Sequence, residues 1–152
     1  MLSWQEVDYA SYYRVYVYDS GWKVIAEVGE CSYTATDLTP SQKYRFAVKA
    51  CYEDDMGSVM APKYVSLYAT TLPANLTTLT TSVTPDSVTL TWNKSEGATG
   101  YRIFIYNNTA KKWDIALRAT HKTTAVINGL ETGKSYRYAV RPYYNSGEGI
   151  IW

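Results

Sequence analysis

Apolar and polar residues alternate with a period of two along residues 87–92, which read Ser-Val-Thr-Leu-Thr-Trp. This alternation predicts a β-strand with one buried face. It recurs in later segments and predicts three strands with these inward-facing residues: Val88, Leu90 and Trp92; Tyr101, Ile103 and Ile105; and Tyr136, Tyr138 and Val140. Turn residues separate such segments, and no segment has a sustained helical period. The pattern therefore predicts an all-β antiparallel sandwich, in which two sheets bury their apolar faces against each other.

The chain contains an internal repeat. Two stretches share a Trp that is followed nine residues later by Tyr-Arg and a β-branched residue: Trp4 with Tyr13-Arg14-Val15, and Trp92 with Tyr101-Arg102-Ile103. Further on, a Leu is followed six residues later by Tyr-Arg in both copies: Leu38 with Tyr44-Arg45, and Leu130 with Tyr136-Arg137. Repetition over this spacing predicts tandem domains. We place them at residues 1–72 and 73–152.

The repeated residues resemble those of the fibronectin type III domain, an immunoglobulin-like sandwich. The resemblance rests on the inward Trp of the second strand (Trp4 and Trp92), the Tyr-Arg opening of the third, and the Leu–Tyr pairs. It implies that Tyr44 and Tyr136 form a tyrosine corner, in which a tyrosine hydroxyl hydrogen-bonds nearby backbone. The Tyr-rich character is similar to repeats in extracellular proteins of Gram-positive bacteria.

Both copies lack part of the expected sandwich. Alignment of the repeats shows that the first copy has no equivalent of residues 75–89, which cover the first strand and most of the second. The second copy ends before an equivalent of residues 63–68, the last strand of the first copy. Open strand edges are templates for pairing with another chain. We therefore expect self-association through these edges.

Composition narrows the classes of partner. Sixteen Tyr and five Trp against two Phe favour strands whose exposed faces carry large side chains that tolerate water. A net charge of +1 argues against nucleic-acid binding. The longest uncharged stretch, residues 64–85, is rich in Thr and interrupted by Pro73, so no membrane span is expected. The first residues show no signal peptide pattern.

Both cysteines lie in the first copy, and the second copy has Thr123 and Tyr143 at the aligned positions. Strand alternation places Cys31 on the core side and Cys51 on the solvent side, so their side chains should diverge. We expect two free thiols.

No constellation of residues predicts catalysis, a cofactor or a metal site. The lone histidine, His121, has no apparent partner for general-base work, and it is most simply a polar surface residue. The adjacent carboxylates Glu53-Asp54-Asp55 lack the alternating spacing of a calcium loop, so we interpret them as a solvated turn.

The candidate site is the solvent face of the sheet opposite the inward residues. In the second copy it carries Arg102, Phe104 and Tyr106, joined by Arg137, Arg141 and Tyr143. In the first copy it carries Arg14, Tyr16 and Tyr18 beside Arg45 and Lys49, and Trp22 and Trp113 belong to the neighbouring edge. One interpretation is structural, because cross-strand stacking of cations on rings contributes up to about 1 kcal/mol per pair. The other is a recognition face for sugar rings, apolar side chains or carboxylates.

The resemblance implies a non-catalytic structural spacer and an adhesion or protein-interaction module of a larger extracellular or cell-surface protein. Its partners would be other domains of the same polypeptide, other proteins or glycans. Two alternatives stay open: an accessory carbohydrate-associated module of a secreted polysaccharide-degrading enzyme, and a self-assembling subunit that uses its incomplete sandwiches.

Overall fold

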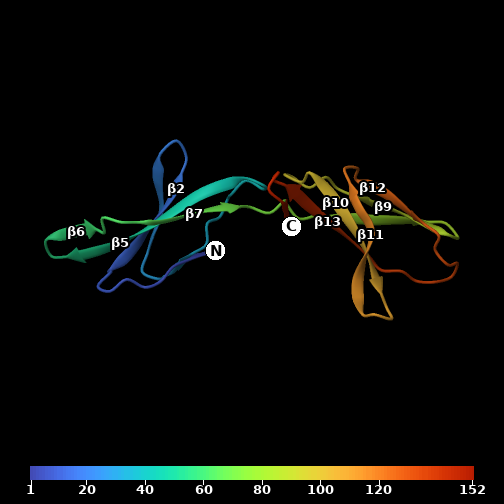
Figure 1. The fold of residues 1–152 in the computed structure, drawn as a ribbon, viewed down its shortest axis with the longest axis horizontal. Coiled ribbons are helices and arrows are strands. Elements are labelled where there is room, and N and C mark those ends of the chain that lie inside the picture. Colours follow the sequence, from blue (N-terminus) through green and yellow to red (C-terminus); the bar gives the residue numbers. More distant parts are fainter. The chain divides into compact units, whose positions relative to one another are not determined.

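The computed structural model describes residues 1–152, and all of its regular elements are β-strands. The chain divides into two compact units, Met1–Thr71 and Leu72–Trp152. Each unit contains its own set of strands (Figure 1). Every strand pair is antiparallel, as the alternating pattern predicts.

The second unit is a sandwich of two sheets. The first sheet has the order β12-β9-β8 and the second β11-β10-β13-β14. The strand bounds are β8 (Leu79–Val83), β9 (Ser87–Trp92), β10 (Gly100–Asn107), β11 (Lys112–Thr120), β12 (Thr124–Asn128), β13 (Tyr138–Asn145) and β14 (Ile150–Ile151).

The core of the second unit lies between these two sheets. Val88, Leu90 and Trp92 of β9 are buried against Tyr101 and Ile103 of β10. Alternate residues of β9 and β10 thus point to the core, because successive side chains of a strand point to opposite faces of its sheet. Partly buried residues complete the core, namely Leu76, Ala98, Ala116, Leu117, Ala125, Ile127, Leu130, Tyr138 and Val140.

The first unit repeats the larger sheet. Its strands are β1 (Leu2–Ser3), β2 (Tyr12–Tyr18), β3 (Trp22–Val28), β4 (Ser32–Tyr33), β5 (Lys43–Asp54), β6 (Gly57–Met60) and β7 (Val65–Thr70). The larger sheet has the order β3-β2-β5-β6, and β7 pairs with the earlier part of β5. Since β6 pairs with the later part of β5, β6 and β7 form an interrupted edge strand. Only the short pair β1-β4 faces this sheet.

The inner face of the first unit is only partly covered. Leu2, Val15 and Phe46 form its buried core. Beyond them, Val65 and Leu67 of β7 remain 71% and 42% exposed. They line an apolar groove together with Leu2, Trp4, Phe46 and Val48. In the second unit, β14 pairs with β13 only at Tyr144 and Asn145. The earlier part of β13 therefore lacks a paired strand on that side, whereas the equivalent part of β5 in the first unit pairs with β7.

Equivalent tyrosines fix a loop in each unit. The Tyr44 hydroxyl accepts a hydrogen bond from the backbone N–H of Thr39, and the Tyr136 hydroxyl accepts one from Glu131, each at 2.9 Å. The neighbouring leucines, Leu38 and Leu130, pack against the two cores. This is the geometry of a tyrosine corner.

A second tyrosine in each unit packs edge-on against the inward tryptophan. The ring centroids of Trp92 and Tyr101 are 5.4 Å apart, and those of Trp4 and Tyr13 are 5.5 Å apart. The Tyr101 hydroxyl accepts a hydrogen bond from the buried backbone N–H of Ser95 at 2.9 Å. By contrast, the buried hydroxyl of Tyr138 has no hydrogen-bond partner, and burial raises the pKa of this phenol.

Cys51 is buried, so the prediction that it would face solvent was wrong. Cys51 does lie on the outer side of β5, but it is 1% exposed. Its register partners are Tyr12 on β2 and Met60 on β6, and a small side chain between two large ones loses contact with water. Cys31 is half-buried, and both thiols are free.

Candidate binding face

The predicted face is built by strand register in both units. Arg102 lies opposite Arg141, and Phe104 lies opposite Ala139. In the first unit Arg14 lies opposite Lys49. Directly opposed residues point to the same side of a sheet, so these side chains share the surface that faces away from the core. We call this surface the outer face.

A stack of one arginine on a tryptophan recurs on the outer face of each unit. In the second unit the Arg137 guanidinium lies 5.4 Å from the ring centroids of both Tyr106 and Trp113. In the first unit Arg45 lies 5.2 Å from Trp22 and 5.5 Å from Tyr68. Arg45 forms no ion pair, and its Nε is buried without a hydrogen-bond partner. Cation–π attraction to the two rings holds this charge in place.

Trp22 also contacts the tyrosines around it. Its ring meets those of Tyr18, Tyr64 and Tyr16 edge-on, with centroid separations of 5.3, 5.7 and 6.5 Å. Tyr64 is 47% exposed and lies in the segment just before β7. The sequence placed Tyr64 within the last strand of the first copy, at residues 63–68, whereas the observed strand β7 begins one residue after Tyr64, at Val65.

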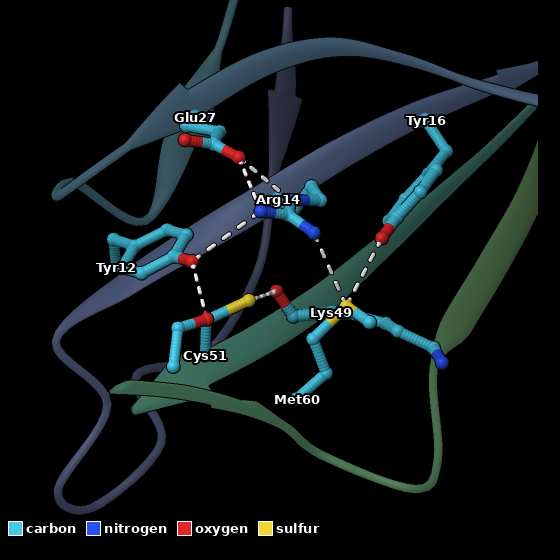
Figure 2. Close-up of polar contacts among 8 residues, drawn as sticks. Tyr12, Arg14, Tyr16, Glu27, Lys49, Cys51 and Met60 are labelled. Carbon is cyan, nitrogen blue, oxygen red and sulfur yellow. Dashed lines mark hydrogen bonds and ion pairs between the residues drawn. The ribbon is translucent and has the colours of Figure 1, made fainter. Parts of the chain in front are cut away.

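Arg14 is held in a separate polar cluster, which Figure 2 shows between β3 and β6. Its Nε donates a hydrogen bond to Glu27 Oε1 at 2.7 Å, and its Nη2 lies 2.6 Å from the same oxygen. Met60 Sδ accepts from Arg14 Nη1 at 3.4 Å and from the Tyr16 hydroxyl at 3.5 Å. The hydrogen bond with Glu27 raises the pKa of Arg14. The charge of Arg14 is therefore neutralised within the face.

The equivalent arginine of the second unit is covered by a ring. The Arg102 guanidinium lies 4.4 Å from the Trp152 ring centroid, and Arg141 lies 5.4 Å from it. Arg102 Nε also donates to the carbonyl of Arg118 at 3.0 Å. Trp152 occupies the repeat position of Met60, so both units cover this arginine from the following strand segment.

Tyr143 is not exposed, although the alternation placed it on the solvent side. It lies on the outer face but is only 7% exposed. Its ring packs against Trp152, with centroids 5.5 Å apart, and fills the space beside Gly100, its register partner. A residue that fills a gap in the sheet has little surface left to offer a ligand.

The outer face of the first unit contains a small aromatic pocket. Its lining residues are Tyr16, Trp22, Ala47, Lys49 and Tyr64, and its volume is about 160 Å³. The lining contains no carboxylate. Lys49 forms no ion pair, and Figure 2 shows its ammonium group extending away from Arg14.

The other candidate residues lie apart from this face. His121 Nδ1 is 2.6 Å from the carbonyl oxygen of Thr99, at an exposed position. Asp54 ends β5, and its carboxylate accepts a hydrogen bond from the backbone N–H of Met56 in the β5–β6 turn. No group of three or more His, Cys, Asp and Glu side chains is placed to hold a metal ion. The structure has no helix that is long and apolar enough to cross a bilayer.

Paired antiparallel sheets, inward tryptophans and tyrosine corners define an immunoglobulin-like sandwich. The family model of the fibronectin type III domain matches residues 72–152. The chain belongs to the fibronectin type III family. A two-domain fibronectin type III segment from chicken tenascin has the same fold: it matches 93% of this chain and 81% of its own, with a TM-score of 0.54 and 18% identity. The prediction of tandem fibronectin type III sandwiches is thus confirmed.

Two curated relatives are similar over most of the chain. Exoglucanase B of Cellulomonas fimi is 32% identical over 139 residues, which cover 81% of this chain and 12% of the relative. Chitinase A1 of Niallia circulans is 32% identical over 143 residues, which cover 85% of this chain and 18% of the relative. The chain spans less than a fifth of the length of either protein.

Proposed function

We propose that this chain is a non-catalytic spacer and interaction module of a larger extracellular or cell-surface protein. One observation carries the proposal: the chain resembles a short segment of each of two much longer proteins, 12% and 18% of their lengths. Such a segment supports its neighbours by setting their spacing and by offering a surface, and its partners are neighbouring domains or other proteins. The outer face supplies that surface in both units.

A second candidate is an accessory role in polysaccharide degradation. It is favoured by the names of the two relatives, an exoglucanase and a chitinase, which act on glucan and chitin. It is also favoured by the exposed rings of the outer face, since aromatic rings stack well on the C–H faces of sugars. In this role the module holds polymer near a catalytic domain of the same polypeptide.

Deletion of residues 1–152 from the longer protein should leave turnover of a small soluble substrate unchanged. Retention on the insoluble partner or polymer should fall by roughly tenfold or more, because a linked module raises the effective concentration of its neighbours at a surface. Activity assays and co-sedimentation measure the two quantities. If residues 1–152 act only as a spacer, an unrelated two-domain spacer in their place should restore retention of the longer protein. If their surface binds the partner or polymer, it should not. Loss of turnover on the soluble substrate would contradict a non-catalytic module.

A third candidate is a self-assembling subunit, and the apolar groove of the first unit favours it. Val65 and Leu67 are exposed along this groove, next to the buried core residues Leu2 and Phe46. A strand from a second copy would cover these side chains and remove apolar surface from water.

Light scattering coupled to size-exclusion chromatography should therefore show association that rises with concentration. Val65→Lys should reduce it, because a charge would have to enter the groove. Val126→Lys is the matched control, since Val126 is exposed on β12 of the other unit. A chain that stays monomeric at all concentrations excludes this candidate.

A further inference from the structure

We propose that the aromatic pocket of the first unit binds a sugar ring that carries a carboxylate, such as a uronic acid unit of a polysaccharide. The proposal rests on the accessory role described above and names the ligand class for one site. The pocket lies between β2, β3, β5 and the segment before β7, and about 160 Å³ gives it room for one small ring rather than for a long segment.

Strand register creates the pocket. Tyr16 and Ala47 are directly opposed partners on β2 and β5. Ala47 is 4% exposed, so its methyl group forms the floor between larger neighbours. Trp22 and Tyr64 stand beside that floor, and their rings meet edge-on with centroids 5.7 Å apart. Rings held at steep angles over a small residue leave a recess with aromatic walls, which suits the C–H face of a pyranose.

The charges around the recess are positive and unbalanced. Lys49 lines it without an ion-pair partner, and Arg45, which stacks on Trp22, has none either. The third cation, Arg14, is neutralised by Glu27. A cationic ligand, which aromatic walls alone would favour, is repelled here. A carboxylate is attracted, and Lys49 can donate a charge-assisted hydrogen bond to it.

The second unit has equivalent strand positions with a different arrangement of side chains. Its equivalents are Phe104, Trp113, Ala139 and Arg141, but Arg141 stacks on Trp152. Trp113 and Arg141 therefore serve as control positions for Trp22 and Lys49.

Isothermal titration of the purified chain with a galacturonic acid hexamer tests the proposal. We expect saturable binding that weakens as salt is added, and much weaker binding of neutral glucan and chitin hexamers. Tyr64→Ala and Lys49→Gln should each weaken the uronate complex by roughly tenfold. Lys49→Gln should also remove most of the salt dependence. Trp113→Ala, in the second unit, should leave the affinity unchanged.

Several results would overturn the proposal: no uronate binding, equal binding of the neutral hexamers, equal binding of a poly-glutamate peptide, or no effect of Tyr64→Ala. Tyr64 is 47% exposed, so Tyr64→Ala should fold, and an unchanged unfolding midpoint verifies this. The proposed function fails separately, because it predicts loss of retention on deletion of the chain whether or not uronate is the ligand.

Discussion

Replacement of Ile103 by Ala should lower the free energy of unfolding of the second unit by about 2–5 kcal/mol. Ile103 is 0% exposed and belongs to the core cluster with Val88, Leu90 and Trp92. Truncation removes three methyl or methylene groups from contact and leaves a cavity that the surrounding strands close only in part. Hydrogen exchange, monitored residue by residue, reports the stability of each unit.

The first unit should keep its stability in this variant, because its core cluster is separate and contains Leu2, Val15 and Phe46. The matched substitution Val15→Ala, at the equivalent repeat position, should have the converse effect and destabilise the first unit alone. Ile115→Ala serves as the exposed control, with an expected change within about 0.5 kcal/mol. Equal losses from Ile103→Ala and Ile115→Ala would show that the assigned core is wrong.

The core was predictable because the signals that specify it are local. Alternation along residues 87–92 identifies the buried side of β9, since successive residues of a strand point to opposite faces. The tyrosine corners were expected from the resemblance to the fibronectin type III family, and the structure contains them: the hydroxyl of Tyr44 accepts a hydrogen bond from a backbone N–H five residues away in sequence.

Burial on the outer face was not predictable from alternation, because it depends on which residues of neighbouring strands lie beside a side chain. Alternation assigned Cys51 and Tyr143 to the correct side of their strands, but the residues that cover them come from other strands or segments. Met60 lies beside Cys51, and Trp152 packs on Tyr143. The aromatic pocket also needs Tyr64, which lies in an irregular segment and reaches Trp22 only through the pairing of β7 with β5.

The two copies fill one position of the sheet in opposite ways. In the second unit Gly100 faces Tyr143, and in the first unit the register pair is Tyr12 with Cys51. A Cβ atom on Gly100 would lie 2.5 Å from the Tyr143 hydroxyl oxygen and 2.6 Å from Cζ. The buried ring packs against Trp152 and has little freedom to move. In the second unit a small residue on β10 faces a large residue on β13, whereas in the first unit a large residue on β2 faces a small residue on β5. The two side chains together fill the same space in each unit.

Gly100→Tyr alone should therefore destabilise the second unit by about 1–3 kcal/mol, because the new ring overlaps that of Tyr143. Tyr143→Cys alone should cost about 3–5 kcal/mol, the usual effect of truncating a buried aromatic side chain. The double variant reproduces the pair of the first unit. It should be more stable than the sum of the single effects predicts, by about 0.5–3 kcal/mol.

Urea unfolding in the presence of a reductant, which keeps the new thiol free, provides the four free energies of this cycle. The control cycle combines Gly100→Tyr with Ile115→Ala, whose side chain is exposed on β11 opposite Phe104. That cycle should be additive within about 0.5 kcal/mol. If the free-energy changes from Gly100→Tyr and Tyr143→Cys were also additive, the side chains at positions 100 and 143 would not compete for the same space. The reversed order of small and large residues in the two units would then have no common cause. A favourable coupling instead means that the large side chain moved from one strand of the pair to the other as the two repeats diverged. The space between the two strands on the outer face stayed filled in both units.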